Sequence, residues 1–460
     1  MTYILDALFV ALGLIIDSKI FYAHFLILLA QVLLREKKMN LEFFLNAAIY
    51  SVILPDNYLP ILFFCLYFIF NFFVTKGYVI KLTSYMMSFL LLVTVSFVST
   101  FLNQVPMINI GFAVISFFPF FAFMWMSNSY DKAMKAINIK NVEFAVDEIL
   151  YIQVFATIIN LFTRYGRVVE DWSYGTFCDV GEQAQLFVVI SLLSLFYLYR
   201  FLKDKKNRSA LYKIIMCGVV MLTTNSWMLL GMFAVGMGLA YFFSLNPKRF
   251  IIASICIILL PSILRVGFTF LPENVQSSVS MMLADTTYLE YRFHKLIVYG
   301  ETYFEIPSKD ALFAVLGNGL GNYNSRGALI CTGAYTEFYR DLFEPSISEY
   351  TGEYIVDYLQ QTRGDYGSVL ARPYASLMAL MGEVGYLGVF FFMVAMVCLF
   401  KRKRMEIKML IMVWLSFCFA ESYFEYPKVI IVLYASIFLI SAFEAENKLS
   451  DNKRQQLVEE

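Results

Sequence analysis

A polar stretch between residues 269 and 371 holds the side chains best suited to chemistry in this sequence. Its guanidinium groups suit a diphosphate, because the planar fork pairs with two oxygens at once. Its many tyrosines and carboxylates suit a sugar, since flat rings cover apolar sugar faces and carboxylates accept hydrogen bonds from hydroxyls. The basic residues of the stretch are Arg292, Lys295, Lys309, Arg326, Arg340 and Arg363. The alternative interpretation is an acidic surface region with ordinary salt bridges.

The segment GNGLGNYNSR, from Gly317 to Arg326, is similar to a phosphate-binding loop. A dinucleotide-binding fingerprint requires an apolar strand before it and a helix after it, and a P-loop requires Gly-Lys followed by Ser or Thr. Neither context is present, because KDALFAVLG precedes the segment and polar residues follow it. The segment alone therefore predicts a tight turn, with Gly317, Gly319 and Gly321 at positive φ.

The rest of the chain predicts the elements that must position these residues. Hydrophobic residues make up 60% of the 460 residues and charged residues 16%, and the apolar residues come in blocks. Blocks of this kind predict an all-α polytopic membrane protein with about 14 transmembrane helices and one large periplasmic loop. The predicted spans are 2–16, 20–34, 41–55, 58–75, 82–102, 108–127, 143–163, 183–202, 211–225, 227–245, 250–268, 373–400, 408–421 and 428–443.

The distribution of positive charge favours one orientation for these spans. The basic clusters REKK, KDKKNR, PKR and KRKR all fall on the inside when both termini are placed in the cytoplasm. Lys19 and Lys428 are the exceptions. The resulting parts are transmembrane helices 1–11 (1–268), the large periplasmic loop with short helices (269–371), the last three transmembrane helices (372–443) and a cytoplasmic tail (444–460).

The composition argues against metal and nucleic-acid chemistry. The chain has 2 His, and its 7 Cys include no Cys-x-x-Cys spacing, which disfavours a zinc or redox centre. The formal net charge is zero, so the balance of charge does not indicate a nucleic acid as partner. We expect no metal and no cofactor.

The order of these features resembles the bacterial O-antigen polymerase and ligase superfamily over about residues 180–400. Members combine a multi-span bundle with a long outer loop that carries a GxGxGxY-like turn. The loop leads into a helix with an ExGxxG pattern. Here the turn is LFAVLGNGLGNYN, the exit is RPYASLMALMGEVGYLG, and the pattern falls on Glu383, Gly385 and Gly388.

The sequence departs from the family pattern in two places. The ligase branch usually has a His just before the exit helix, whereas Arg372-Pro373-Tyr374 stands here, and this favours the polymerase branch. Many members have Ser-Arg at the outer end of a span, whereas Trp227 follows Ser226 here. The arginine function must then come from elsewhere, such as Arg265 or Arg292.

The resemblance implies a metal-independent glycosyltransferase of the bacterial inner membrane, with its active site facing the periplasm. A growing glycan would leave undecaprenyl diphosphate and join the sugar of an incoming lipid-linked repeat unit. The expected partners are the undecaprenyl-diphosphate-linked oligosaccharide, as donor and acceptor, and the lipid bilayer. A chain-length regulator is left open as a protein partner.

The candidate site residues follow from this chemistry. Arginines must stabilise the leaving diphosphate where no metal does so, and a carboxylate must take the proton of the attacking hydroxyl. The catalytic candidates are Arg292, Arg326, Arg363, Arg372, Glu337 and Asp365. The candidates for binding the diphosphate or the glycan are Arg265, Arg164, Arg167, Gly317, Gly319, Gly321, Tyr323, Tyr374 and Glu383.

Three other functions are compatible with the sequence. A lipid-linked glycan flippase or transporter explains many spans, but it does not need a long outer loop and usually has repeated halves, which are not visible here. A ligase would transfer the same donor to another acceptor. A structural scaffold of an export complex would tolerate alanine at every arginine of the loop.

Overall fold

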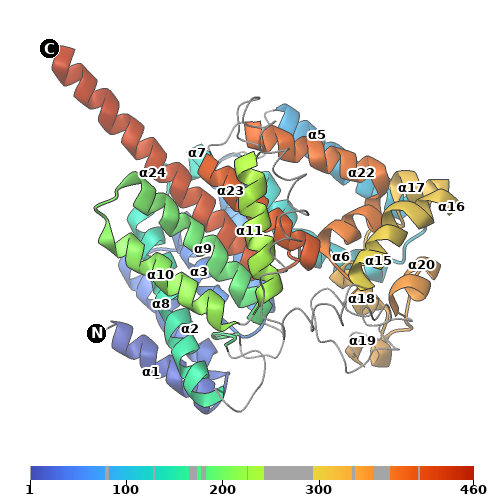
Figure 1. The fold of residues 1–460 in the computed structure, drawn as a ribbon, viewed down its shortest axis with the longest axis horizontal. Helices are drawn as coiled ribbons and strands as arrows, with labels where there is room; N and C mark the ends of the chain where they lie inside the picture. Colours follow the sequence, from blue (N-terminus) through green and yellow to red (C-terminus); the bar gives the residue numbers. More distant parts are fainter. Residues whose placement is uncertain are drawn as a thin grey trace, which may run out of the picture.

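The computed structural model describes residues 2–77, 82–127, 130–164, 173–177, 183–224, 226–242, 294–333, 337–356, 373–401 and 405–459. Every regular element in these ranges is a helix, which confirms the predicted all-α class (Figure 1). A helix lies at each predicted span that falls within the described residues. The predicted span 250–268 lies outside them.

Five helices of the described residues are long and apolar enough to cross a membrane. Each supplies about 20 predominantly apolar residues, the length that a bilayer core requires. They are α5 (Ser84–Leu102), α6 (Met107–Met126), α9 (Gln183–Lys203), α22 (Ser376–Lys401) and the Pro427–Glu446 part of α24 (Pro427–Glu459). The chain is therefore a helical membrane protein, and the further predicted spans remain predictions.

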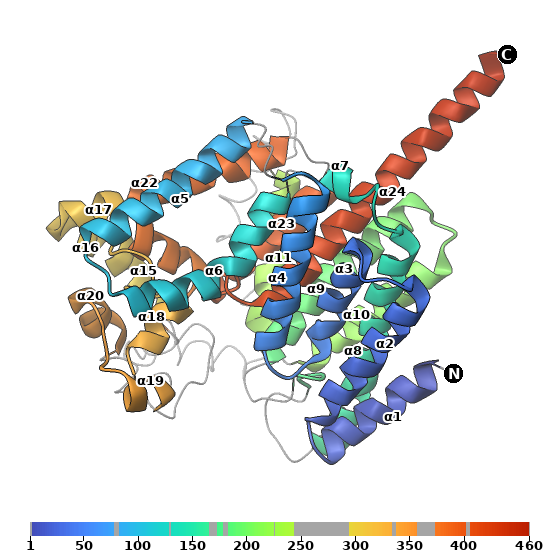
Figure 2. The ribbon, with the colours of Figure 1, turned by 180° about the vertical axis from the view of Figure 1, so that it is seen from behind.

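The remaining helices of the main bundle are shorter or more polar. They are α1 (Thr2–Ile15), α2 (Ile20–Glu36), α3 (Leu41–Tyr50), η1 (Ser51–Ile53), α4 (Tyr58–Val74), α7 (Tyr130–Ala133), α8 (Ile139–Arg164), α10 (Arg208–Thr223), α11 (Trp227–Phe242) and α23 (Met405–Ala420). Several of them, such as α3, α4, α8 and α23, contact α24, whereas α1, α2, α10 and α11 pack on those helices and on α9. Residues Ile430, Leu433 and Phe438 of α24 are completely buried. Figures 1 and 2 show α24 running through the bundle, with its C-terminal part projecting beyond it, so the tail predicted at 444–460 continues this helix to Glu459.

Short helices of the predicted loop gather at one end of the paired helices α5 and α22 (Figures 1 and 2). They have their own small apolar core, which includes Val298, Ile306, Phe313 and Leu329. The predicted loop therefore folds onto the membrane helices in its described part. Its elements are α15 (His294–Gly300), η2 (Glu301–Glu305), α16 (Ile306–Lys309), α17 (Ala311–Leu316), α18 (Arg326–Cys331), α19 (Glu337–Leu342), α20 (Glu349–Thr351) and η3 (Gly352–Val356).

Close packing of α11 on α23 depends on a glycine. A Cβ atom at Gly236 would lie 2.6 Å from the Cα of Val413. We expect Gly236→Leu to force the two helices apart and to destabilise the protein by about 1–3 kcal/mol, the usual effect of overpacking. Thermal unfolding of the purified protein measures this loss. Gly238→Leu on the same helix is the matched control, because a Cβ there meets nothing within 4 Å; equal losses in both variants would contradict the prediction.

Candidate functional site

The glycines of GNGLGNYNSR form a tight turn that only glycine fits. Gly317, Gly319 and Gly321 have φ values of 70°, 89° and 72°, which L side chains rarely adopt. The turn also presses against its neighbours, since a Cβ at Gly321 would lie 2.4 Å from the Asn109 carbonyl oxygen. The turn predicted from the sequence is therefore present, and two separate constraints require glycine in it.

The carboxylate of Glu383 occupies the concave side of this turn. The backbone N–H of Gly321 donates to Glu383 Oε2 at 3.0 Å, and that of Ser325 donates to Oε1 at 3.1 Å. The N–H of Gly319 donates to the Glu383 carbonyl at 3.0 Å. Successive N–H groups of this kind make an anion-binding concavity. Here the anion site is filled by the chain's own carboxylate, 62 residues away from Gly321 in sequence.

A break in α22 allows the turn to approach Glu383. Gly385 has a φ of 63°, so α22 is two helices joined at this residue, where the sequence predicts one continuous span at 373–400. A Cβ at Gly385 would lie 2.5 Å from the backbone of Val315 and Leu316, at the end of α17. The ExGxxG pattern therefore has a physical basis, since Glu383 accepts hydrogen bonds from the turn and Gly385 opens the helix to it.

Polar residues at the adjoining ends of α5 and α6 complete the docking of the turn. The side-chain amide of Asn103 donates to the Gly317 carbonyl, and that of Asn109 donates to the Gly321 carbonyl, both at 3.0 Å. Thr100 Oγ1 accepts the N–H of Leu320 at 3.0 Å. None of these residues is among the predicted site residues, although polar side chains at the end of the predicted span 82–102 and the start of the span 108–127 are a usable signal.

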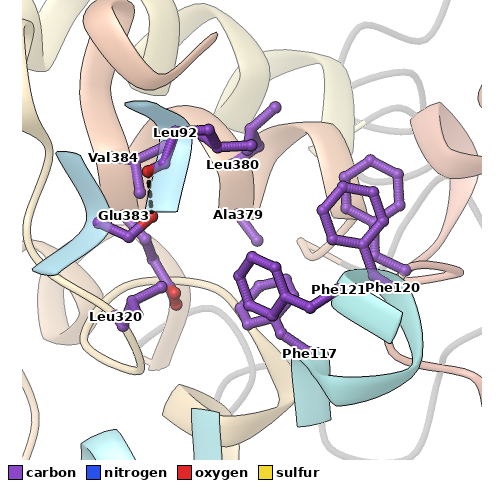
Figure 3. Close-up of a pocket in the computed structure, with 11 residues that line it drawn as sticks. Leu92, Phe117, Phe120, Phe121, Leu320, Ala379, Leu380, Glu383 and Val384 are labelled. Carbon is purple, nitrogen blue, oxygen red and sulfur yellow. Dashed lines mark hydrogen bonds between the residues drawn. The ribbon is translucent and has the colours of Figure 1, made fainter. Parts of the chain in front are cut away.

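A small apolar pocket lies beside Glu383, between α5, α6 and α22. Its cavity volume is about 20 Å³, room for about one water molecule. Figure 3 shows Leu92, Leu380 and three phenylalanine rings around it. The residues that line the pocket include no basic side chain. The pocket therefore suits an apolar group and is a poor place for a diphosphate.

The turn between α23 and α24 brings a carboxylate and an arginine together. The backbone N–H of Arg326 donates to Glu425 Oε2 at 2.8 Å, and the Arg326 guanidinium carbon lies 4.6 Å from the centre of the Tyr426 ring. Glu425 is only 2% exposed, and its Oε1 has no partner among the described residues. Burial raises the pKa of Glu425 to about 8. Glu425 is not among the site residues predicted from the sequence.

The start of α15 packs on the same turn. The Lys295 ammonium donates to the Ala420 carbonyl at the end of α23, where a cation is favourable for the helix dipole. The ring of Tyr374, at the entry to α22, lies 5.8 Å from Lys295 Nζ. Glu421 is nearly buried, and its Oε2 has no partner within the described part of the chain. We call Lys295, Arg326, Tyr374, Glu421 and Glu425 the turn cluster.

An open aromatic groove adjoins the turn cluster. It holds about 660 Å³ of open space between α15, η2, the start of α22 and the end of α23. Tyr299 stacks on Phe419 with ring centroids 4.5 Å apart, and its hydroxyl donates to the Phe419 carbonyl. Tyr303 lines the groove as well, and its hydroxyl donates to the Leu377 carbonyl. Aromatic walls of this kind suit an apolar sugar face or a lipid chain.

Arg164 lies at a second buried segment, Ser173 to Phe177. Its guanidinium carbon is 4.6 Å from the centre of the Tyr174 ring. The segment is held inside the bundle by α8, because the Asn160 amide donates to the Gly175 carbonyl at 3.1 Å. Lys428 Nζ lies 4.0 Å from the centre of the Phe177 ring. Arg164 and Lys428, at the start of α24, therefore bring positive charge to both sides of this segment.

The other predicted site residues divide into two groups. Tyr323 is fully buried, with its hydroxyl 2.6 Å from Thr302 Oγ1, and in this position it is a packing residue with no exposed ring face. Glu337 begins α19. The remaining candidates lie outside the described residues; they are Arg167, Arg265, Arg292, Arg363, Asp365 and Arg372. Of the predicted residues, Arg326 lies against Glu425 and Tyr374 lies against Lys295, both in the turn cluster, whereas the turn of Gly317, Gly319 and Gly321 packs on Glu383.

No group of three or more His, Cys, Asp or Glu residues suited to a metal ion occurs within the described ranges. No protein-family model, curated protein or solved structure matches this chain significantly.

Proposed function

We propose that this chain is a membrane glycosyltransferase that polymerises lipid-linked oligosaccharide repeat units, of the O-antigen polymerase type. In this proposal it transfers a growing glycan from undecaprenyl diphosphate to the sugar of a new lipid-linked repeat unit. The protein would lie in a bacterial inner membrane with about 14 spans, both termini in the cytoplasm and the turn cluster facing the periplasm.

The observation that carries the proposal is the contact between Glu425 and Arg326. Glycosyl transfer needs a base for the attacking hydroxyl and positive charge for the leaving diphosphate. Glu425 Oε1 is buried and has no partner in the described part of the chain, so it is able to accept the hydroxyl proton. The backbone of Arg326 donates to the other oxygen of Glu425, and its guanidinium, which acts on Glu425 electrostatically, would supply the charge.

In the proposed reaction, Glu425 takes the proton of the acceptor hydroxyl and Arg326 stabilises the leaving diphosphate. The acceptor hydroxyl oxygen bonds to the anomeric carbon of the donor, and the bond from that carbon to the diphosphate oxygen breaks. The proton of the hydroxyl passes to Glu425, and the electron pair leaves with the diphosphate, which Arg326 stabilises. Tyr299 and Phe419 in the adjoining groove are suited to hold the sugar face or the lipid chain.

Arg326→Ala tests the proposal with little change to the fold, because the backbone N–H that donates to Glu425 remains. We expect the rate of glycan lengthening to fall by about 10²–10³, as for other lost donors to a developing negative charge. The measurement is the lengthening of a purified lipid-linked oligosaccharide by the reconstituted protein, resolved by size on a gel.

The control variant is Lys309→Ala, which removes an exposed lysine paired only at the surface, with Glu305 and Tyr354. It should lengthen the glycan at the wild-type rate. An Arg326→Ala protein as active as the control would overturn the assignment of Arg326. Wild-type protein that moves labelled lipid across the bilayer without lengthening the glycan would indicate a flippase instead. Transfer of the glycan to another acceptor without lengthening would indicate a ligase.

A further inference from the structure

Four ionisable residues meet inside the bundle, on helices that do not contribute to the turn cluster. His24 Nε2 of α2 lies 3.0 Å from Asp6 Oδ1 of α1. The Tyr50 hydroxyl of α3 donates to Glu148 Oε2 of α8. Asp6 and Glu148 also interact electrostatically, so the two pairs form one group. We call these four residues the buried acid cluster.

The buried acid cluster has almost no access to solvent. Asp6 is 1% exposed, and His24 and Glu148 are 0% exposed. Three of its polar atoms, Asp6 Oδ2, His24 Nδ1 and Glu148 Oε1, have no partner among the described residues. A purely structural polar contact normally satisfies its members, because each buried unpaired group costs about 1–3 kcal/mol. The open atoms therefore indicate groups that bind something further.

The charges around Glu148 do not balance a carboxylate anion. Asp6 brings a second carboxylate that acts on Glu148, and Asp6 is itself paired with His24. Arg35 is the other cation that acts on Glu148, but it is paired with Glu36 at 3.5 Å and its side chain is 34% exposed. Lys213 is engaged by Asp147 at 2.6 Å, next to Glu148 on α8. An unbalanced charge inside a membrane protein is costly, and a bound proton removes it.

We propose that the buried acid cluster is a proton-binding site. Glu148 binds the proton beside the Tyr50 hydroxyl, and the Asp6–His24 pair lies next to it. The binding step adds one proton to one carboxylate and needs no other reactant. This proton-binding site does not depend on the proposed glycan transfer, because none of its four residues belongs to the turn cluster.

Infrared spectroscopy of the full-length protein in lipid tests the site without any measurement of activity. A protonated carboxyl has a carbonyl band well separated from the carboxylate bands, and this band shifts in deuterated water. We expect Glu148→Gln to remove one such band, and Tyr50→Phe to shift it, because the hydroxyl no longer donates to Glu148. Raising the pH should convert the band to a carboxylate band in the wild type.

Asp147→Asn is the matched control, because Asp147 is adjacent on α8 and is ion-paired with Lys213. It should leave the protonated-carboxyl band unchanged. Asp6→Asn should alter the pH at which the band disappears, since it removes the acid that acts on Glu148. The proposal is overturned if Glu148→Gln leaves all protonated-carboxyl bands in place. If Glu148→Gln does not fold, the Tyr50→Phe variant decides. A protonated-carboxyl band that is not shifted in Tyr50→Phe then refutes the site.

Discussion

Glu383→Ala should release the glycine turn from the membrane helices and abolish glycan lengthening. The substitution removes the acceptor of the Gly321 and Ser325 N–H groups, both of which are buried. Each buried donor left without a partner costs about 1–3 kcal/mol. Arg326 lies five residues after Gly321, so disorder of the turn should also loosen the hydrogen bond from the Arg326 backbone N–H to Glu425.

Two measurements check the effect of Glu383→Ala. Thermal unfolding of the purified protein should show a lower melting temperature, and limited proteolysis should cut the 294–333 segment faster than in the wild type. Glu383→Gln keeps one acceptor oxygen, so its melting temperature and its cleavage rate should lie between those of the wild type and those of Glu383→Ala. Glu344→Ala replaces an exposed acid of the same loop and is the control. If Glu383→Ala melts and is cleaved like this control, the carboxylate does not hold the turn.

Glu425→Gln is expected to reduce glycan lengthening by about 10²–10⁴, the contribution of a positioned general base. Glutamine keeps the shape and still accepts the Arg326 N–H, but it cannot take the hydroxyl proton. The pKa of Glu425 is about 8, so the active, ionised form becomes populated as the pH rises through this value. The wild-type rate should therefore rise with a midpoint near pH 8 and level off only about one pH unit above it.

The residual activity of Glu425→Gln should lose this pH dependence, which rate measurements across the same range would reveal. A Glu425→Gln protein with the wild-type rate and pH profile would remove Glu425 from the mechanism. Such a result would leave Arg326 to be judged by its own variant.

The same raised pKa has a consequence for stability. The pKa of Glu425 lies above its ordinary value of 4.5, so the folded state holds the proton more tightly than the unfolded state. By linkage, this stabilisation is fully present below about pH 4.5 and is lost as the pH rises towards 8. Glu425→Gln should lack this part of the pH dependence. The measurement is the change in melting temperature between pH 5 and pH 8 for the wild type and for Glu425→Gln. An equal change in both proteins would contradict the raised pKa of Glu425.

The sequence by itself determined the helical membrane architecture and the position of most helices. Blocks of apolar residues specify a helix locally, because a bilayer leaves backbone groups no other partners. The glycine turn was also predictable from the sequence, since alternating glycines permit positive φ whatever surrounds them. The loop at 269–371 is predicted to contain short helices, but only the structure gives their positions.

Only the tertiary structure decided what these elements hold together. Glu383 is 62 residues from Gly321, Glu425 is 99 residues from Arg326, and Glu148 is 98 residues from Tyr50. Such pairs leave no periodic trace in the sequence, because each depends on how separate helices pack. The break at Gly385 is likewise invisible in an apolar run, since what requires it is the backbone of α17 pressed against α22.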